Sequence, residues 1–167
     1  METADKLPVQ IVIAEDNPAD VKLVHMALRD AGLNCSLRIV GDGAQAIALI
    51  ETLDADSKAA PIDLLLLDMH LPKYDGEDVL KRLRSTDLNL PKKNGEDVLR
   101  RLRSSAKCGR TLVLVVTSSD SARDREPVAA LGIAGYFKKP SEYAEFMKLG
   151  SIVKRLLEET TPSADAE

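Results

Sequence analysis

The chain has 167 residues, of which 44% are hydrophobic and 30% charged, with no Trp, three Tyr and two Phe. A chain of this length fits one ordinary α/β domain built around a single, mainly aliphatic core. The net charge is −4 and basic residues are interleaved with acidic ones, which argues against binding of nucleic acid or of an anionic membrane surface.

Cysteine use and the N-terminal sequence bear on the cellular compartment. Cys35 and Cys108 lack the spacing of a metal site or a disulfide framework, so we expect reduced thiols. The opening METADKLPVQ contains no secretion signal, and no apolar run approaches the roughly 18 residues that a membrane span needs. We expect a cytoplasmic protein with one domain over residues 8–160 and short tails at 1–7 and 161–167.

Five short runs rich in Val, Ile and Leu alternate with segments of helical period, which predicts a parallel sheet with crossover helices. The third and fourth runs are almost purely aliphatic, so they should be buried on both faces. The predicted strands are Val9–Ala14, Ser36–Val40, Ile62–Leu67, Leu112–Val116 and Ala134–Lys138.

The first helix has the clearest boundaries. Asn17 is its predicted N-cap, Pro18 occupies its first position, and Asp20 stands where a capping carboxylate belongs. Gly32 should stop the helix just after Ala31.

Three further helices are predicted outside the segment between the third and fourth strands. One begins after Gly43, and the last begins near Ser141. Between the fourth and fifth strands, Pro127 removes a backbone donor, so we expect only a short helix at about Glu126–Leu131.

A tandem duplication separates the third and fourth strands. Residues 68–86 read DMHLPKYDGEDVLKRLRST and residues 87–105 read DLNLPKKNGEDVLRRLRSS, with 13 of 19 positions identical. One pair of copies is no solenoid, which needs about three repeats or more. We therefore expect one domain that carries an extra loop and helix.

The two copies compete for one position in the fold. If the second copy replaced the first, Arg84 would be buried at the end of the central strand without a partner, at a cost of several kcal/mol. We therefore expect the first copy to form the ordinary third helix at about Glu77–Ser85, with residues 87–105 as the insertion. Such an insertion costs only about 1 kcal/mol in closure entropy.

The second copy still carries an apolar stripe made by Val98, Leu99 and Leu102. A stripe of this kind seeks burial, so Glu96–Ser104 should form a supernumerary helix. We expect it on the side of the domain or in a dimer contact, far from the carboxyl edge of the sheet. In the alternative arrangement the copies exchange, and the first one loops out beside Asp68.

Polar residues follow four of the predicted strands. Glu15 and Asp16 follow the first, Asp68 the third, Thr117 the fourth and Lys139 the fifth, so they should converge on one edge of the sheet. Three carboxylates repel one another unless a cation neutralises them, and this oxygen-only set suits Mg²⁺. The central carboxylate can then attack phosphorus while the metal and the lysine stabilise the oxygens, which predicts an aspartyl phosphate.

These motifs make the chain similar to the receiver domains of two-component response regulators over about residues 8–160. The resemblance implies a doubly wound, flavodoxin-like (CheY-like) fold with five parallel strands in the order 2-1-3-4-5. The run EDNPAD at 15–20, with the TSS at 117–119, most resembles the single-domain regulators of phytochrome-type sensor histidine kinases. The matching motifs are AEDN at 14–17, VGDG at 40–43, LLLLDMHLP at 64–72 with Gly76, VVTSS at 115–119 and YFKKP at 136–140.

The resemblance also implies a role for individual residues. Asp68 would be the phosphoacceptor, assisted by Thr117 and Lys139, and Thr117 with Tyr136 would form the switch. Pro140 would follow a cis peptide bond. The implied Mg²⁺ ligands are Glu15, Asp16, Asp68 and the backbone carbonyl of His70.

The duplication gives two candidate phosphoacceptors, Asp68 and Asp87. Asp68 lies 49 residues before Thr117, one 19-residue repeat more than the family pattern, whereas Asp87 lies 30 residues before it. Counting alone favours Asp87, but only Asp68 follows a strand that can lie at the centre of the sheet.

We therefore expect a single-domain response regulator that is phosphorylated by a sensor histidine kinase or a phosphotransfer protein and signals by protein contact, with a homodimer left open. The usual switching surface of the family comprises the helix after the fourth strand, the fifth strand and the last helix. We expect self-dephosphorylation but no turnover of an external substrate, because a phosphatase would need a second carboxylate where His70 stands. The alternative is a phosphorylation-independent interaction module in which the duplicated helix is a docking surface.

Overall fold

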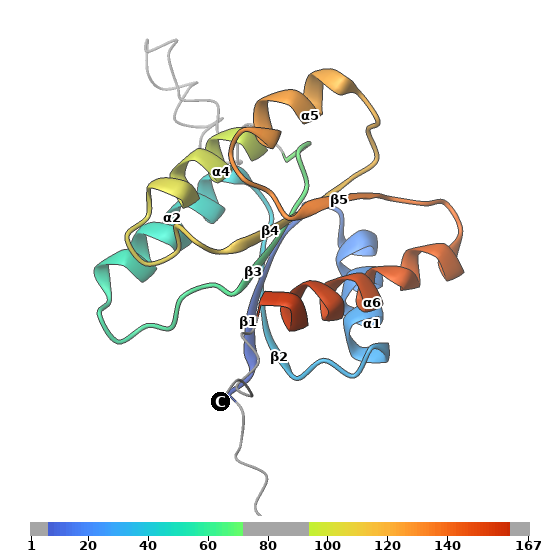
Figure 1. The fold of residues 1–167 in the computed structure, drawn as a ribbon, viewed down its shortest axis with the longest axis horizontal. Coiled ribbons are helices and arrows are strands. Elements are labelled where there is room, and N and C mark those ends of the chain that lie inside the picture. The colour runs from blue at the N-terminus through green and yellow to red at the C-terminus, as the bar shows by residue number, and fades with distance from the viewer. Residues whose placement is uncertain (1–6, 72–93, 161–167) are drawn as a thin grey trace, which may run out of the picture.

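The computed structural model describes residues 7–71 and 94–160. A parallel sheet of five strands, in the order β2-β1-β3-β4-β5, runs through the centre of the domain (Figure 1). This order confirms the predicted fold class. The strands are β1 (Val9–Ala14), β2 (Cys35–Val40), β3 (Leu64–Leu67), β4 (Leu112–Thr117) and β5 (Gly135–Lys138).

Helices cover both faces of the sheet, so two apolar layers are enclosed (Figure 1). Two helices, α1 and α6, pack together on one face, while α2, α4 and α5 cover the other. Their bounds are α1 (Pro18–Asp30), α2 (Gly43–Ala55), α4 (Gly95–Ser104), α5 (Ala122–Ala129) and α6 (Tyr143–Thr160).

The central strands are buried on both faces, as their aliphatic runs predict. All four leucines of β3 are at most 2% exposed. The edge strand β2 has exposed positions instead, among them Ile39. Because β1 connects to the edge strand β2 before the chain crosses back to β3, β1 and β3 form a topological switch point, where ligands of such sheets bind.

The first helix follows its sequence signals closely. The Asn17 side chain accepts a hydrogen bond from the Ala19 N–H at 3.0 Å, and Pro18 takes the first position. The helix ends at Asp30, and Gly32 has a φ of 70°, a conformation that glycine adopts without steric cost.

The helix of the second repeat copy lies in the core of the domain. Gly95–Ser104 forms α4, as predicted, but it packs against α2, and the side chains of Val98, Leu99 and Leu102 are fully buried. We expected this helix on the side of the domain or in a dimer contact, whereas its apolar stripe is buried in the core against α2. That residues 87–105 are the insertion stays a prediction. The helix predicted at Glu77–Ser85 lies outside the described residues.

The N-terminus of α4 lies close to the carboxyl edge of the sheet, contrary to our prediction. A Cβ atom added at Gly95 would come within 2.9 Å of the Met69 Cα and 3.1 Å of the Asp68 carbonyl oxygen. Only glycine allows so close an approach of two backbones. The start of α4 is thus in contact with the loop that follows β3.

Hydrogen bonds at the C-terminal end of α4 explain why this copy fills the position. The Arg103 guanidinium donates to the carbonyls of Leu131, Gly109, Thr111 and Gly132 at 2.6–3.1 Å. These bonds fasten the end of the helix to the connection that leads into β4, through Gly109 and Thr111, and to the connection between α5 and β5, through Leu131 and Gly132. Because the second copy is the one joined directly to β4, its helix can make them without a long connection.

The helix α5 differs from the short helix that Pro127 led us to expect. It begins at Ala122, because the Ser121 side chain caps it by accepting from the Arg123 N–H at 3.2 Å. Pro127 therefore lies inside the helix, which ends two residues later at Ala129. Proline removed one backbone donor but did not delay the start of the helix.

Candidate functional site

Three carboxylates meet at the carboxyl edge of the sheet, as predicted. Glu15 and Asp16 follow β1 and Asp68 follows β3, and one oxygen from each lies within 4.8 Å of the others. Glu15 and Asp68 are buried, at 5% and 6% exposure, while Asp16 is exposed. Buried and exposed carboxylates together form a cluster that is open to solvent on one side.

Backbone hydrogen bonds fix the two buried carboxylates. The Asn17 N–H donates to Glu15 Oε1 at 3.0 Å, and the His70 N–H donates to Asp68 Oδ1 at 2.9 Å. Each acceptor is thus held by the turn that follows its own strand. The site is shaped by the ends of β1 and β3 before any ligand enters.

Lys139 closes the site from the end of β5. Its Nζ atom contacts Glu15 Oε2 at 2.5 Å, Asp20 Oδ2 at 2.9 Å and Asp68 Oδ2 at 3.0 Å. Burial alone would lower the pKa of Lys139, but the hydrogen bonds that it donates to Glu15, Asp20 and Asp68 together raise that pKa above its ordinary value. The lysine is therefore a stable cation within the cluster.

The charges of the cluster leave room for a divalent cation. Burial raises the pKa of Glu15 to about 7, although Lys139 and the Asn17 N–H act in the opposite direction. Three carboxylates also contact the single ammonium of Lys139, so its one positive charge does not balance theirs. A hard cation bound by Glu15, Asp16 and Asp68 would supply the missing charge, and their oxygens are the ligands that Mg²⁺ prefers.

The predicted switch residues lie on neighbouring strands. Thr117 is buried at the end of β4, where its Oγ1 accepts a hydrogen bond from the Ser119 N–H at 3.2 Å. Tyr136 on β5 donates its hydroxyl to the Arg125 carbonyl at 2.8 Å, and the Arg125 guanidinium lies 5.0 Å from the centre of its ring. Their switch role stays a prediction.

His70 has two separate surroundings. Its N–H binds Asp68, whereas its side chain is about half exposed and lies 3.8 Å from Asp124. The exposed imidazole fits the view that only the backbone of this residue belongs to the site. The role of its carbonyl as a metal ligand stays a prediction.

At this edge the structure differs from the prediction at Pro140 and adds an unpredicted contact of Asp20. The peptide bond before Pro140 is trans, as are all described peptide bonds, in keeping with the ordinary preference of about 0.5–1 kcal/mol for trans. Asp20 is a partner of Lys139, which its interpretation as a capping residue missed. The signal was its place in the first turn of α1, which starts at the carboxyl edge.

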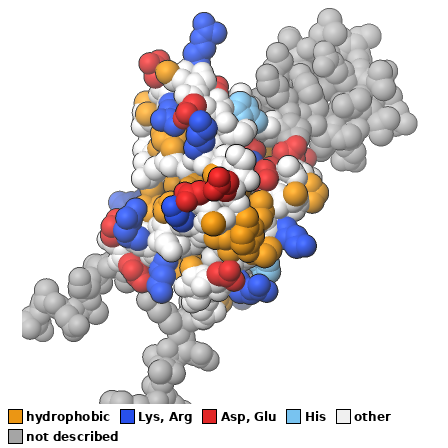
Figure 2. Space-filling view, turned by 90° about the vertical axis from the view of Figure 1, so that its right-hand side faces the viewer, with side chains coloured by type: hydrophobic (Ala, Val, Ile, Leu, Met, Phe, Trp, Pro, Cys, Tyr) orange, Lys and Arg blue, Asp and Glu red, His pale blue; other side chains and the backbone are white. Residues whose placement is uncertain are grey.

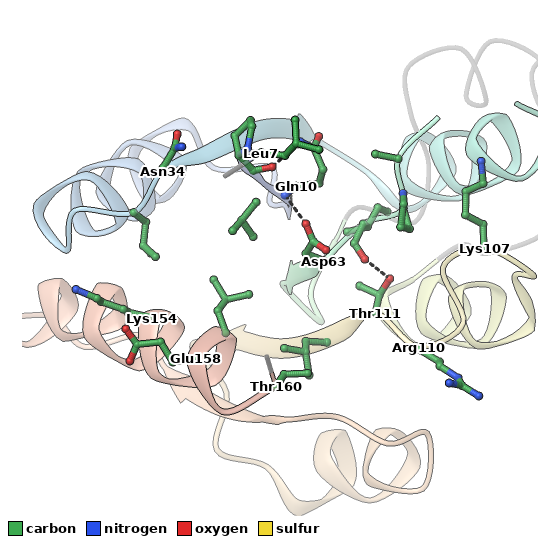
Figure 3. A pocket seen from close by; sticks show the side chains of 18 of the residues that line it. Leu7, Gln10, Asn34, Asp63, Lys107, Arg110, Thr111, Lys154, Glu158 and Thr160 are labelled. Carbon is green, nitrogen blue, oxygen red and sulfur yellow. Dashed lines mark hydrogen bonds between the residues drawn. The ribbon is translucent and has the colours of Figure 1, made fainter. Parts of the chain in front are cut away.

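A second hollow lies at the opposite, amino edge of the sheet (Figure 3). This cavity of about 910 Å³ is bordered by Leu7 and Thr160, the first and last described residues. Asp63 lies in it, bound to the Gln10 N–H at 2.7 Å, and its lining is mainly apolar. It lacks the grouped carboxylates of the carboxyl edge.

The surface shows how charge is distributed away from the site. Figure 2 shows acidic and basic side chains interleaved on the face that it presents, with no patch of one sign. Among the described helices, none is long and apolar enough to span a membrane.

The sheet order and the acidic cluster with its lysine define a receiver domain of the CheY-like class. Residues 11–87 match the model of the response regulator receiver domain. The fold is similar to the phosphorylated cyanobacterial phytochrome response regulator RcpA, with a TM-score of 0.71 and 25% identity over 93% of this chain and 99% of that one. Residues 11–87 therefore match the response regulator receiver domain, and the structural neighbours of the chain are receiver domains of this kind.

Two further relatives bear on this family. The Mn²⁺-bound form of response regulator Rcp1 has a TM-score of 0.69 and 26% identity over 92% of this chain and 98% of that one. The probable transcriptional regulatory protein TcrX of Mycobacterium tuberculosis is 31% identical over 93% of this chain and 54% of its own length. The chain spans about half the length of the curated relatives that it matches first.

Proposed function

We propose that this receiver domain takes a phosphoryl group from a sensor histidine kinase, or from a phosphotransfer protein, onto Asp68. The observation that carries the proposal is the buried Asp68 carboxylate, held 3.0 Å from the ammonium of Lys139 beside the acidic pair. A carboxylate in such surroundings is a nucleophile for phosphorus whose attack a cation can assist.

In the reaction, an Asp68 oxygen forms a bond to phosphorus while the bond from phosphorus to the donor breaks. The product is an acyl phosphate, and the donor leaves with the electron pair of the broken bond. Lys139 donates hydrogen bonds to the transferring oxygens, and the Thr117 hydroxyl binds one of them afterwards. The domain releases the group by its own hydrolysis and turns over no external substrate.

Glu15, Asp16, Asp68 and the carbonyl of His70 would hold the Mg²⁺ ion that this reaction needs. When bound, the ion neutralises charge on the phosphoryl oxygens. The Mn²⁺ in the structure of the relative Rcp1 and the carboxylate oxygens of this chain both support a divalent cation here.

The signal would then leave the domain through protein contact. The output surface that we propose is formed by α5, β5 and α6. Thr117 ends the neighbouring strand β4, and Tyr136 of β5 donates a hydrogen bond to the Arg125 carbonyl of α5. A homodimer through this surface is one form that the contact can take.

The alternative was a phosphorylation-independent interaction module that docks through the duplicated helix. The burial of Val98, Leu99 and Leu102 speaks against it, because this stripe is occupied within the domain. The Asp68 cluster favours the phosphorylated form of signalling.

Intact-protein mass spectrometry tests the proposal. Incubation with a small phosphodonor such as acetyl phosphate and Mg²⁺ should add one acid-labile phosphoryl group, and omission of Mg²⁺ should prevent it. An unchanged mass in the presence of both reagents would refute the proposed function.

A further inference from the structure

Asp20, in the first turn of α1, contacts the ammonium of Lys139. Its carboxylate lies 2.9 Å from the lysine Nζ, and the two side chains are 22% and 11% exposed. Asp20 does not belong to the cluster of three carboxylates that could hold a cation, which consists of Glu15, Asp16 and Asp68. It therefore touches the lysine but not the candidate metal position.

Lys139 uses all its hydrogen-bonding capacity on three different segments. An ammonium has three N–H donors, and here one partner follows β1, one lies on α1 and one follows β3. The lysine is thereby tied to both strands of the switch point and to the first helix at once.

Two of these three partners are also the groups that a cation or a phosphoryl group would engage. Glu15 and Asp68 belong to the candidate metal cluster, and Asp68 is the proposed acceptor. When Glu15 and Asp68 bind a cation or a phosphoryl group instead, the largely buried ammonium of Lys139 loses much of the negative charge that balances it. An unpaired buried charge is costly, so a partner outside the metal cluster lowers the cost of the exchange.

We propose that Asp20 is a positioning residue that holds the Lys139 ammonium at the carboxyl edge while Glu15 and Asp68 exchange partners. It makes cation binding easier without contacting the cation, and it keeps the lysine in reach of the phosphoryl oxygens. The inference rests on the proposed function for its second part, while its first part concerns the cation alone.

A double-mutant cycle tests the inference through Mg²⁺ affinity, measured by calorimetry on the full chain. Asp20→Ala should weaken binding about tenfold when Lys139 is present. In the Lys139→Met background the same substitution should change binding less than twofold, because the charge that it compensates is gone. Asp30→Ala, which removes the same charge from the exposed end of α1, is the matched control and should have no measurable effect.

Two more measurements separate positioning from a general effect on the fold. Without metal, Asp20→Ala should lower the urea midpoint of unfolding more in the parent than in the Lys139→Met background. At saturating Mg²⁺ it should slow phosphorylation by acetyl phosphate several-fold, and Asp20→Glu should restore part of the rate.

Equal losses of Mg²⁺ affinity in both backgrounds would overturn the inference, since Asp20 would then act on the cation directly. No loss in either background would overturn it as well. A parent chain that binds Mg²⁺ with the expected coupling but never gains a phosphoryl group would refute the proposed function alone.

Discussion

The carboxyl edge of the sheet and the α2–α4 layer are built from sequence in opposite ways. At the edge, a few polar residues from segments far apart in the chain meet, and each follows its own strand. In the layer, α4 contributes apolar side chains that the chain carries twice, once in each repeat copy. The place of a site residue directly after its strand identifies that residue uniquely. A duplicated amphipathic pattern, in contrast, does not show which of the two copies forms the helix that packs against α2.

The largest expected effect is at the acceptor. Asp68→Asn should abolish acid-labile phosphorylation, because it removes the nucleophile that lies 3.0 Å from Lys139. Asp87→Asn, the same substitution at the matching position of the second copy, should leave phosphorylation intact. Asp87 lies outside the described residues. Its distance from Thr117 along the sequence favoured it as the acceptor, whereas the position after a central strand favours Asp68. The two variants therefore test these two criteria directly. Intact-protein mass spectrometry of both variants decides, and phosphorylation of Asp68→Asn would reverse the assignment.

The second largest effect distinguishes the two copies in the core. Leu102→Ala should cost about 2–5 kcal/mol in the free energy of unfolding, because it empties a fully buried position. Leu83→Ala changes the matching leucine of the first copy and should cost less than about 1 kcal/mol. Urea unfolding of both variants provides the measurement.

Deleting either copy would be less informative than this pair, because each deletion leaves one complete copy of the helix sequence. The point substitutions mark the copies separately. A larger loss for Leu83→Ala than for Leu102→Ala would show that the first copy fills the core in solution.

The contrast also explains what the sequence could predict. Aliphatic runs located all five strands, and Asn17, Pro18 and Gly32 located α1, because local steric and hydrogen-bonding preferences act there alone. The acidic cluster followed from the convergence of parallel strands at one edge.

The features that the sequence did not predict correctly depend mainly on contacts between distant segments. The place of α4 depends on the bonds of Arg103 to carbonyls near β4 and β5, which no local pattern reveals. Asp20 looked like a capping residue because its partner, Lys139, lies 119 residues away. In α5, the cap at Ser121 prevailed over Pro127.

A smaller effect is expected for the exposed member of the cluster. Asp16→Asn should weaken Mg²⁺ binding at least about tenfold, since it removes charge from one of few hard ligands, and tenfold equals about 1.4 kcal/mol. The free energy of unfolding without metal should change by less than about 0.5 kcal/mol, because the side chain is exposed. Calorimetric titration and urea unfolding check the two statements, and unchanged affinity would remove Asp16 from the site.

The smallest effect concerns the polar contacts that join α2 to the end of α4. Asp54 accepts hydrogen bonds from the Ser105 hydroxyl at 2.6 Å, from Arg101 at 3.0 Å and from the Lys107 N–H at 3.2 Å. The Ser105 bond is the main cause that lowers the pKa of Asp54 below its ordinary value of 3.8, with Arg101 and Lys107 acting in the same direction.

A carboxyl group whose pKa is lower in the folded than in the unfolded chain stabilises the fold above its unfolded pKa. That contribution is lost as the pH falls through the folded value. Asp54→Asn should therefore lower the urea midpoint slightly at neutral pH, and the difference from the parent should shrink once the pH falls below about 3.9. Asp56→Asn, two residues further on, is a suitable control for the loss of one exposed charge. A difference that persists undiminished in acid would show that Asp54 stabilises the α2–α4 contact through its shape and not through its charge.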